Sequence, residues 1–191
     1  MVGVGKIFPY FIRAHLSARP SLQTIIIWNI TPAKAQALVE KLRLGLGSVE
    51  IVCGGDDLDA IVGSADVISC ATSSESPLIH GGFVKPGTHL DLVGSFAPSM
   101  RECNDEALAR ARVFVDCDVA LKAAGELVGA FCKGVLRPVN VVGTLAELAR
   151  GSKGGRSWSE EVTIFKSIGS AIVDLITTQL IYEKNLQGSS D

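Results

Sequence analysis

The sequence lacks the features that define several classes of protein. Its longest apolar-rich stretch, residues 168–181, is broken by polar residues and falls short of the ~20 residues that span a membrane. Lysine and arginine form no basic stripe, and the net charge is −2. The three histidines are scattered, and no Cys-x-x-Cys spacing occurs. We therefore predict no membrane span, no nucleic-acid partner and no metal site.

The cysteines are few and irregularly spaced. There are five, an odd number, and Cys70 and Cys117 lie inside apolar runs typical of strands. Disulfides are characteristic of secreted proteins and rare in reducing compartments. We therefore interpret the five cysteines as reduced thiols of a soluble intracellular protein. A length of 191 residues with 47% apolar residues is sufficient for one sizeable globular domain.

A glycine turn stands at the start of the chain. Met1 and Val2 precede Gly3-Val-Gly5, and a Gly-x-Gly turn that holds a dinucleotide normally follows a strand and opens a helix. Apolar residues at helical spacing over 7–16 predict that helix. Two residues cannot form a strand of the usual length of ~5–6 residues. We therefore expect a chain that begins within the motif and lacks the first strand.

The rest of the chain alternates between strand and helix patterns. The predicted strands are 23–28, 49–53, 66–71, 88–93, 112–116 and 162–165. The predicted helices are 33–44, 58–61, 105–111, 121–133, 144–150 and 170–185, with a polar loop over 151–160 and a disordered tail from Gln187. This alternation, with near-continuous apolar strands, predicts an α/β fold with a doubly wound parallel sheet of the Rossmann type.

Small and polar residues follow four of the predicted strands. They are Gly3-Val-Gly5, Asn29-Ile-Thr31, the run 71–74 and Gly94-Ser95. In an open parallel sheet, ligands bind outside the carboxyl ends of the strands, where small residues admit a ligand and hydroxyls bind it. The pattern favours a nucleotide site, the alternative being that these are ordinary turn residues.

The second of these strand ends bears on the type of cofactor. An acid there binds a ribose 2′-hydroxyl, whereas a nearby arginine binds a 2′-phosphate. This chain has neither, only Asn29 and Thr31, with Lys34 one helical turn on. Lys34 is either a point charge for a phosphate or a solvated helix residue.

Candidate catalytic groups are scarce. Asp116, Asp118 and Glu126 lie at or after a strand end, where carboxylates act as acids or bases. Such groups more often cap helices or pair with cations, and the structural interpretation is favoured here. No catalytic residue is assigned.

Five segments resemble the ornithine cyclodeaminase/mu-crystallin family. They are Gly3-Val-Gly-Lys-Ile-Phe-Pro-Tyr10, Ile26-Ile-Trp-Asn29, Ala65-Asp-Val-Ile-Ser-Cys-Ala-Thr72, Lys85-Pro-Gly-Thr-His-Leu-Asp-Leu-Val-Gly-Ser95 and Val162-Thr-Ile-Phe-Lys-Ser-Ile-Gly169. Within the family, the sequence is most similar to plant ketimine reductases that form pipecolate. The resemblance implies a dimeric enzyme with a Rossmann-type domain and a second domain for substrate binding and dimerisation. It also implies hydride transfer from NADPH or NADH to the C=N bond of a small cyclic imino acid, in the cytoplasm or a plastid.

Three residues depart from the family pattern. Phe96 stands where ornithine cyclodeaminases have a catalytic Asp, which favours a reductase over a cyclodeaminase. Ile30 replaces an Arg suited to a 2′-phosphate, which leaves the choice between NADPH and NADH open. Phe8 replaces a small residue, and we expect its ring to crowd the packing of helix on sheet.

The resemblance divides the chain at residue 169. Residues 1–169 are expected to form the NAD(P)-binding domain without its first strand, and residues 170–191 to belong to the substrate and dimerisation domain, most of which is missing. The expected cofactor contacts are Gly3, Gly5, Asn29, Thr31, Lys34, Thr72, Val93, Gly94, Ser95 and Ser167. The alternatives are a non-catalytic, mu-crystallin-like protein that binds NADP or another small ligand and, less favoured, an ornithine cyclodeaminase. Without the first strand, we expect the isolated chain to be poorly stable.

Overall fold

The computed structural model describes residues 1–43, 45 and 49–188. The strands are β1 (Thr24–Ile27), β2 (Glu50–Cys53), β3 (Val67–Cys70), β4 (His89–Leu92), β5 (Arg112–Val115), β6 (Gly143–Thr144) and β7 (Thr163–Lys166). The α-helices are α1 (Phe8–Ala18), α2 (Pro32–Leu42), α3 (Leu58–Ser64), α4 (Asp105–Arg110), α5 (Ala120–Ala123), α6 (Gly125–Cys132), α7 (Leu145–Ala149) and α8 (Ala171–Gly188). Two 3₁₀ turns are η1 (Gly81–Phe83) and η2 (Pro138–Asn140).

The strands form two parallel sheets, which confirms the α/β class. β1 pairs with β2, and a larger sheet has the order β3-β4-β7-β5-β6. The crossover from β1 to β2 carries α2 and that from β5 to β6 carries α5 and α6, whereas that from β3 to β4 carries the 3₁₀ turn η1. Because every pairing is parallel, the carboxyl ends of neighbouring strands lie at the same edge.

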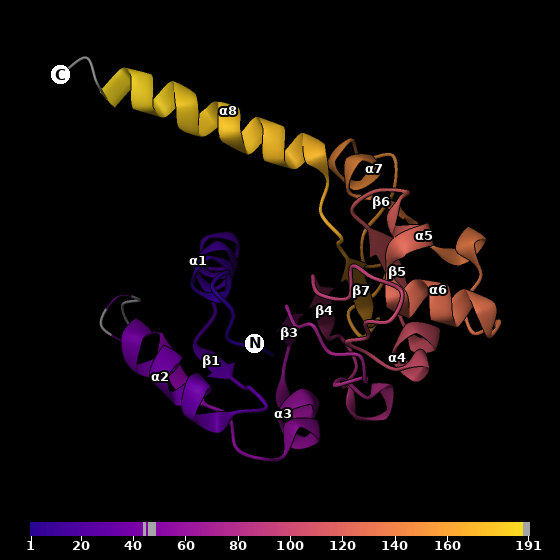
Figure 1. Cartoon of the computed structure of the whole chain (residues 1–191). Coiled ribbons are helices and arrows are strands. Elements are labelled where there is room, and N and C mark those ends of the chain that lie inside the picture. The colour runs from indigo at the N-terminus through magenta and orange to yellow at the C-terminus, as the bar shows by residue number, and fades with distance from the viewer. Residues whose placement is uncertain (44, 46–48, 189–191) are drawn as a thin grey trace.

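Val2 joins the two sheets. It forms parallel bridges with Trp28 on one side and Cys70 on the other. Its N–H donates to the Ser69 carbonyl at 2.8 Å, and the Trp28 N–H donates to the Met1 carbonyl at 2.9 Å. At their carboxyl ends, β1 and β3 thus share a partner that the sequence pattern did not predict. Figure 1 shows the N-terminus between them.

Two groups of buried side chains form the core. The smaller one packs α1 and α2 on β1 and β2, and Phe8, which is fully buried, lies in it with Ile12, Ile27 and Val39. The Phe8 ring, which was expected to crowd the packing of helix on sheet, thus lies inside this core. The larger group packs α3, α4 and α6 on the five-stranded sheet.

Three further sequence predictions need correction. The helix predicted over 121–133 is two helices, α5 and α6, which meet at Ala124. The two-residue strand β6 was not predicted. The predicted disorder of the tail is wrong for Gln187 and Gly188, which end α8, while residues 189–191 lie outside the described residues.

The last helix stands apart from the sheets. Figure 1 shows α8 as a long rod that follows β7 and extends away from the sheets. Its apolar side chains are exposed, among them Ile172, Leu175, Ile176 and Tyr182. In the part of the chain that the structure describes, no helix has the length and apolar content to cross a membrane.

Candidate functional site

The glycine turn begins at the edge where the strands end. Gly3 has φ of +109°, and its N–H donates to the Trp28 carbonyl at 2.9 Å. A β-carbon on Gly3 would lie 2.8 Å from the Phe8 ring and 3.1 Å from the Ala71 carbonyl, so only glycine fits. The buried Phe8 ring and the close approach of Ala71 therefore fix the start of the turn.

Open space lies beside the second glycine. Gly5 is exposed, and a β-carbon there would meet no atom within 4 Å. α1 begins three residues later with Pro9 in its first turn and no acidic side chain there. The N–H groups of Phe8, Tyr10 and Phe11 donate to the carbonyls of Gly5 and Ile7, so the attraction for an anion comes from the partial positive charge at the start of the helix. The turn, the open space and the uncharged first turn of the helix fit the pyrophosphate of a dinucleotide.

The end of β1 brings three of the predicted contacts together. The Asn29 side-chain amide donates to the Thr31 carbonyl at 3.1 Å, and the Lys34 N–H donates to the same carbonyl at 3.0 Å. The Thr31 hydroxyl makes no capping hydrogen bond to α2, and the Lys34 side chain is exposed. Ile30, between them, is 80% exposed. This end of β1 thus presents an amide, a hydroxyl and an ammonium to solvent.

The ends of β3 and β4 are joined by a buried carboxyl group. The Thr72 N–H donates to Glu102 Oε1 at 2.6 Å. A β-carbon on Gly94 would overlap both the Thr72 carbonyl oxygen and Glu102 Oε1. Gly94 and Thr72 therefore lie in direct contact, and a side chain at Gly94 would push the two strand ends apart.

Ser95 is held within the protein. It has φ of +50°, a strained value for a residue with a side chain, and it is fully buried. Its hydroxyl donates to the Met100 carbonyl at 2.6 Å. Val93, which precedes Gly94, is half-buried, and its N–H donates to the Cys70 carbonyl at 2.9 Å. Ser95 thus shapes the loop and does not direct its hydroxyl outward.

Asp116 organises the loop after β7. Its Oδ2 accepts from the Ser167 hydroxyl at 2.9 Å and from the N–H groups of Ile168 and Gly169 at 2.9 and 2.8 Å. Its Oδ1 accepts from the Cys117 N–H at 2.8 Å. These bonds support the structural interpretation of Asp116. They also direct the Ser167 hydroxyl toward the protein.

Three charged residues lie buried beneath these loops, and two of them were not predicted from the sequence. Lys166, Glu102 and Glu126 are at most 1% exposed. Only Glu126 was singled out, as a candidate acid. Burial is the main cause that raises the pKa of Glu102, with the nearby Glu126 adding to the rise. The one feature of the sequence that could have indicated this buried cluster is Lys166, a lysine at the end of the apolar strand β7.

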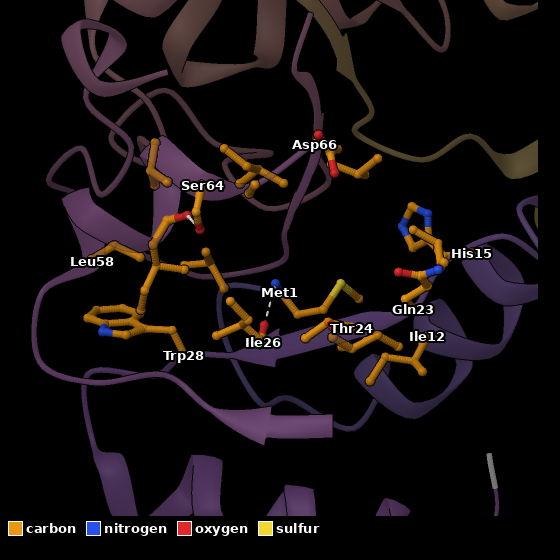
Figure 2. Close-up of a pocket in the computed structure, with 18 of the residues that line it drawn as sticks. Met1, Ile12, His15, Gln23, Thr24, Ile26, Trp28, Leu58, Ser64 and Asp66 are labelled. Atoms are coloured by element: carbon orange, nitrogen blue, oxygen red, sulfur yellow. Dashed lines mark hydrogen bonds between the residues drawn. The ribbon is translucent and has the colours of Figure 1, made fainter. Parts of the chain in front are cut away.

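A cavity of about 320 Å³ lies between β1 and β3, at the amino ends of these strands. Figure 2 shows its lining, with Met1 at its inner end and Gln23 and Asp66 on opposite walls. The Met1 ammonium donates to the Ile26 carbonyl at 2.9 Å, and burial lowers the pKa of this amine. None of the ten predicted contacts lines the cavity, so it is not the predicted cofactor site. Among the described residues, no group of three potential metal ligands forms.

The sequence profile of the ornithine cyclodeaminase/mu-crystallin family matches residues 1–189. This chain belongs to that family. The family members most informative for the site are two curated relatives and one solved structure.

The relatives match nearly the whole chain. Protein SAR DEFICIENT 4 of Arabidopsis thaliana is 51% identical over 187 residues, which cover 97% of this chain and 58% of the relative. A Δ1-pyrroline-2-carboxylate reductase of Paracoccus denitrificans is 37% identical over 183 residues, covering 95% of this chain and 57% of the relative. The chain therefore spans less than two thirds of the length of these relatives.

The solved structure has a similar fold. Δ1-Pyrroline-2-carboxylate reductase of Thermococcus litoralis, in complex with NADH and L-proline, superposes with a TM-score of 0.93 at 29% identity. The match covers 98% of this chain and 58% of that one. The arrangement of strands and helices is thus that of a family member that holds a dinucleotide.

Proposed function

We propose that residues 1–169 form the dinucleotide-binding part of an NAD(P)H-dependent reductase of cyclic imino acids. The observation that carries the proposal is the Gly3–Gly5 turn, which leaves open space at the edge where the strand ends meet. The solved relative with NADH and L-proline and the reductase of Paracoccus denitrificans support it. The substrate class is a cyclic ketimine carboxylate, either piperideine-2-carboxylate or pyrroline-2-carboxylate.

The reduced nicotinamide supplies the hydride that converts the C=N bond into the amine of pipecolate or proline. The protein binds and orients the cofactor. Gly3 and Gly5 leave room for the pyrophosphate, and Asn29 and Thr31 bind the adenosine ribose. Lys34 supplies a positive charge beside them, which suits the 2′-phosphate of NADPH. Position 30 is an isoleucine and not an arginine, which favours NADH. We therefore propose NADPH or NADH as the cofactor.

The nicotinamide half lies at the next strand ends in this proposal. Val93, Gly94 and Ser95 contribute their backbone groups, because the Ser95 hydroxyl donates to the Met100 carbonyl. The Thr72 hydroxyl accepts from the Ser74 N–H and keeps its own proton to donate. Ser167 contributes its hydroxyl oxygen as an acceptor, since the hydroxyl proton is directed to Asp116. The contacts are thus mainly those of a rigid backbone around the ligand.

Residues 170–191 have a separate role in the proposal. The exposed apolar side chains of α8, including Ile172 and Leu175, are suited to packing against another part of a dimer. We assign this helix to the substrate and dimerisation domain and expect the active form to be a homodimer.

A glycine substitution tests the dinucleotide site. Gly5→Asp places a carboxylate where the pyrophosphate is proposed to lie, and we expect NADH binding to weaken by more than tenfold. Gly155→Asp is the matched control, because Gly155 is also exposed and its β-carbon would also meet no atom within 4 Å. Quenching of tryptophan fluorescence by NADH and NADPH gives both affinities. Equal binding by the two variants would contradict the site.

Oxidation of the cofactor tests the reaction. Absorbance at 340 nm should fall when the protein, NADPH or NADH and piperideine-2-carboxylate or pyrroline-2-carboxylate are mixed. Binding without oxidation would instead favour the second candidate, a carrier that holds the nucleotide without turnover. That candidate is supported by the ten proposed contacts, which include no carboxylate and no imidazole. Release of ammonia from ornithine would favour a cyclodeaminase, for which Phe96 supplies no acid.

A further inference from the structure

Lys166 ties the end of β7 to the loop after β4. It is the last residue of β7 and is 1% exposed. Its ammonium group donates to the Leu92 carbonyl at 3.2 Å and to the Gly94 carbonyl. A buried ammonium is costly unless it is paired, so these carbonyls and a carboxylate must compensate it. The nearest carboxylate is Glu126 on α6, whose Oε2 lies 3.9 Å from Lys166 Nζ.

The contacts continue to the loop after β3. Glu126 Oε1 accepts from the Glu102 N–H at 2.6 Å, and Glu102 Oε1 accepts from the Thr72 N–H at 2.6 Å. Lys166 and Glu102 therefore act on two adjacent loops. One fixes Gly94 and the other fixes Thr72, and Gly94 and Thr72 lie in contact where no side chain fits between them.

The charges in this cluster do not balance as a simple ion pair. One ammonium faces two carboxyl groups, and Glu102 Oε2 and Glu126 Oε2 have no hydrogen-bond partner among the described residues. A purely structural core position is better filled by apolar side chains of similar volume, because desolvation offsets much of the attraction between buried charges. The three buried charged groups beneath the two strand ends therefore indicate that these ends must be held at a fixed position.

We propose that Lys166, Glu126 and Glu102 are positioning residues for the nicotinamide half of the cofactor. Their contacts hold the backbone of Gly94 and Thr72 at a fixed separation, and the cofactor meets that backbone. This inference rests on the proposed function. It separates the two halves of the dinucleotide, because the cluster touches the loops after β3 and β4 and makes no contact with Asn29 or Thr31 at the end of β1.

The test compares NADH with ADP-ribose, which has the adenosine half and the pyrophosphate but no nicotinamide. The variant Lys166→Met with Glu126→Gln removes both charges of the ion pair and leaves the buried Glu102 carboxyl, which keeps its hydrogen bond from the Thr72 N–H. We expect it to fold, to bind ADP-ribose as the unmodified protein does, and to bind NADH roughly tenfold more weakly, which corresponds to about 1.4 kcal/mol. Titration calorimetry measures both ligands. Lys85→Met is the matched control, since Lys85 is a surface lysine paired with Asp66.

A second pair of variants keeps Lys166 in place. Glu102→Gln retains an oxygen that accepts from the Thr72 N–H, so the ratio of NADH to ADP-ribose affinity should stay within about twofold of the unmodified protein. Glu102→Ala removes that acceptor and should lower the ratio roughly tenfold, as expected for a lost hydrogen bond to a buried group. A simple loss of folding would lower both affinities together and would overturn the positioning role.

The outcomes separate the two proposals. Binding of neither ligand by the unmodified protein would overturn the proposed function and the positioning role with it. Normal binding by the unmodified protein, with an unchanged affinity ratio in the double variant and in Glu102→Ala, would overturn the positioning role alone. The positioning role is supported if the ratio of NADH to ADP-ribose affinity falls in the double variant and in Glu102→Ala but is unchanged in Glu102→Gln and Lys85→Met.

Discussion

The substitution Asp116→Asn tests how the loop after β7 is held. Asp116 accepts four hydrogen bonds, three on Oδ2 and one on Oδ1. Asparagine has a single oxygen. In its better orientation this oxygen keeps the three donors of the Ser167–Gly169 loop, while its NH₂ group faces the Cys117 N–H. One hydrogen bond is then lost, and the other three no longer have a charged acceptor.

The size of the effect follows from these bonds. A hydrogen bond to a charged group contributes roughly 1.5–3 kcal/mol and a neutral one about 0.5–1.5 kcal/mol. Taken at the middle of these ranges, the loss of charge in three bonds and of one bond outright comes to about 6 kcal/mol, which is an upper limit because all four bonds share one carboxylate. Asp116 is half-buried and Gly169 is exposed, so water replaces part of the loss. We expect about 2 kcal/mol, which lowers the melting temperature by roughly 4–8 °C in a protein of this size.

Thermal unfolding followed by circular dichroism measures this shift. Asp118→Asn is the control. Asp118 lies two residues after Asp116 and its side chain is exposed, so this variant removes the same charge from the surface. It should change stability by less than about 0.5 kcal/mol. If the two variants melt at the same temperature, the bonds to Asp116 do not hold the loop, and the structural interpretation of this carboxylate fails.

Three further outcomes are expected. In hydrogen exchange by NMR, the amide of Ile26, which faces the cavity, should exchange faster than that of Ile25, which faces β2. Equal protection of the two amides would mean that the edge of β1 beside the cavity is also hydrogen-bonded. Burial lowers the pKa of His89, so the unfolded chain binds its proton more readily, and stability should be full above about pH 6.5 and fall below it. His89→Gln should flatten that fall in urea titrations at pH 7 and 5, and an unchanged slope would exclude His89 as its cause. Thr144→Ala removes the capping box with Glu147 and should lower stability by about 1 kcal/mol, whereas Thr144→Ser should retain it.

Sequence patterns predicted most strands because each is a short apolar run between turn residues. Ile25-Ile-Ile27 is the clearest case, and the structure places β1 there. The break between α5 and α6 was not predictable in this way. Ala123 and Glu126 near the break are good helix formers, and a single glycine such as Gly125 does not by itself end a helix. The break lies where Gly125 passes close to the Met100 carbonyl, a contact that no local pattern encodes. β6 has two residues and therefore no periodicity to detect.

In the candidate site, too, some residues were predictable from the sequence and others were not. The residues that leave space, such as Gly3 and Gly5, were predictable because a small residue after a strand can be recognised from the neighbouring sequence alone. The residues that position them were not. Lys166 and Gly94 are 72 residues apart in the sequence, and only the pairing of β4 with β7 brings the ammonium to the carbonyl. The direction of a hydroxyl, as in Ser167, likewise depends on a distant partner, Asp116.

The bridges made by Val2 have a consequence for the order of folding. Val2 is synthesised before both of its bridge partners, Trp28 and Cys70. β1 and β2 can pair as soon as both have emerged, whereas the two sheets can join only after β3 has been synthesised. During translation, Val2 can therefore pair with Trp28 at the end of β1, but its other side stays without a partner until β3 has been made. This interval is the period in which a chaperone, or an extended segment of another chain, would find that sheet edge open.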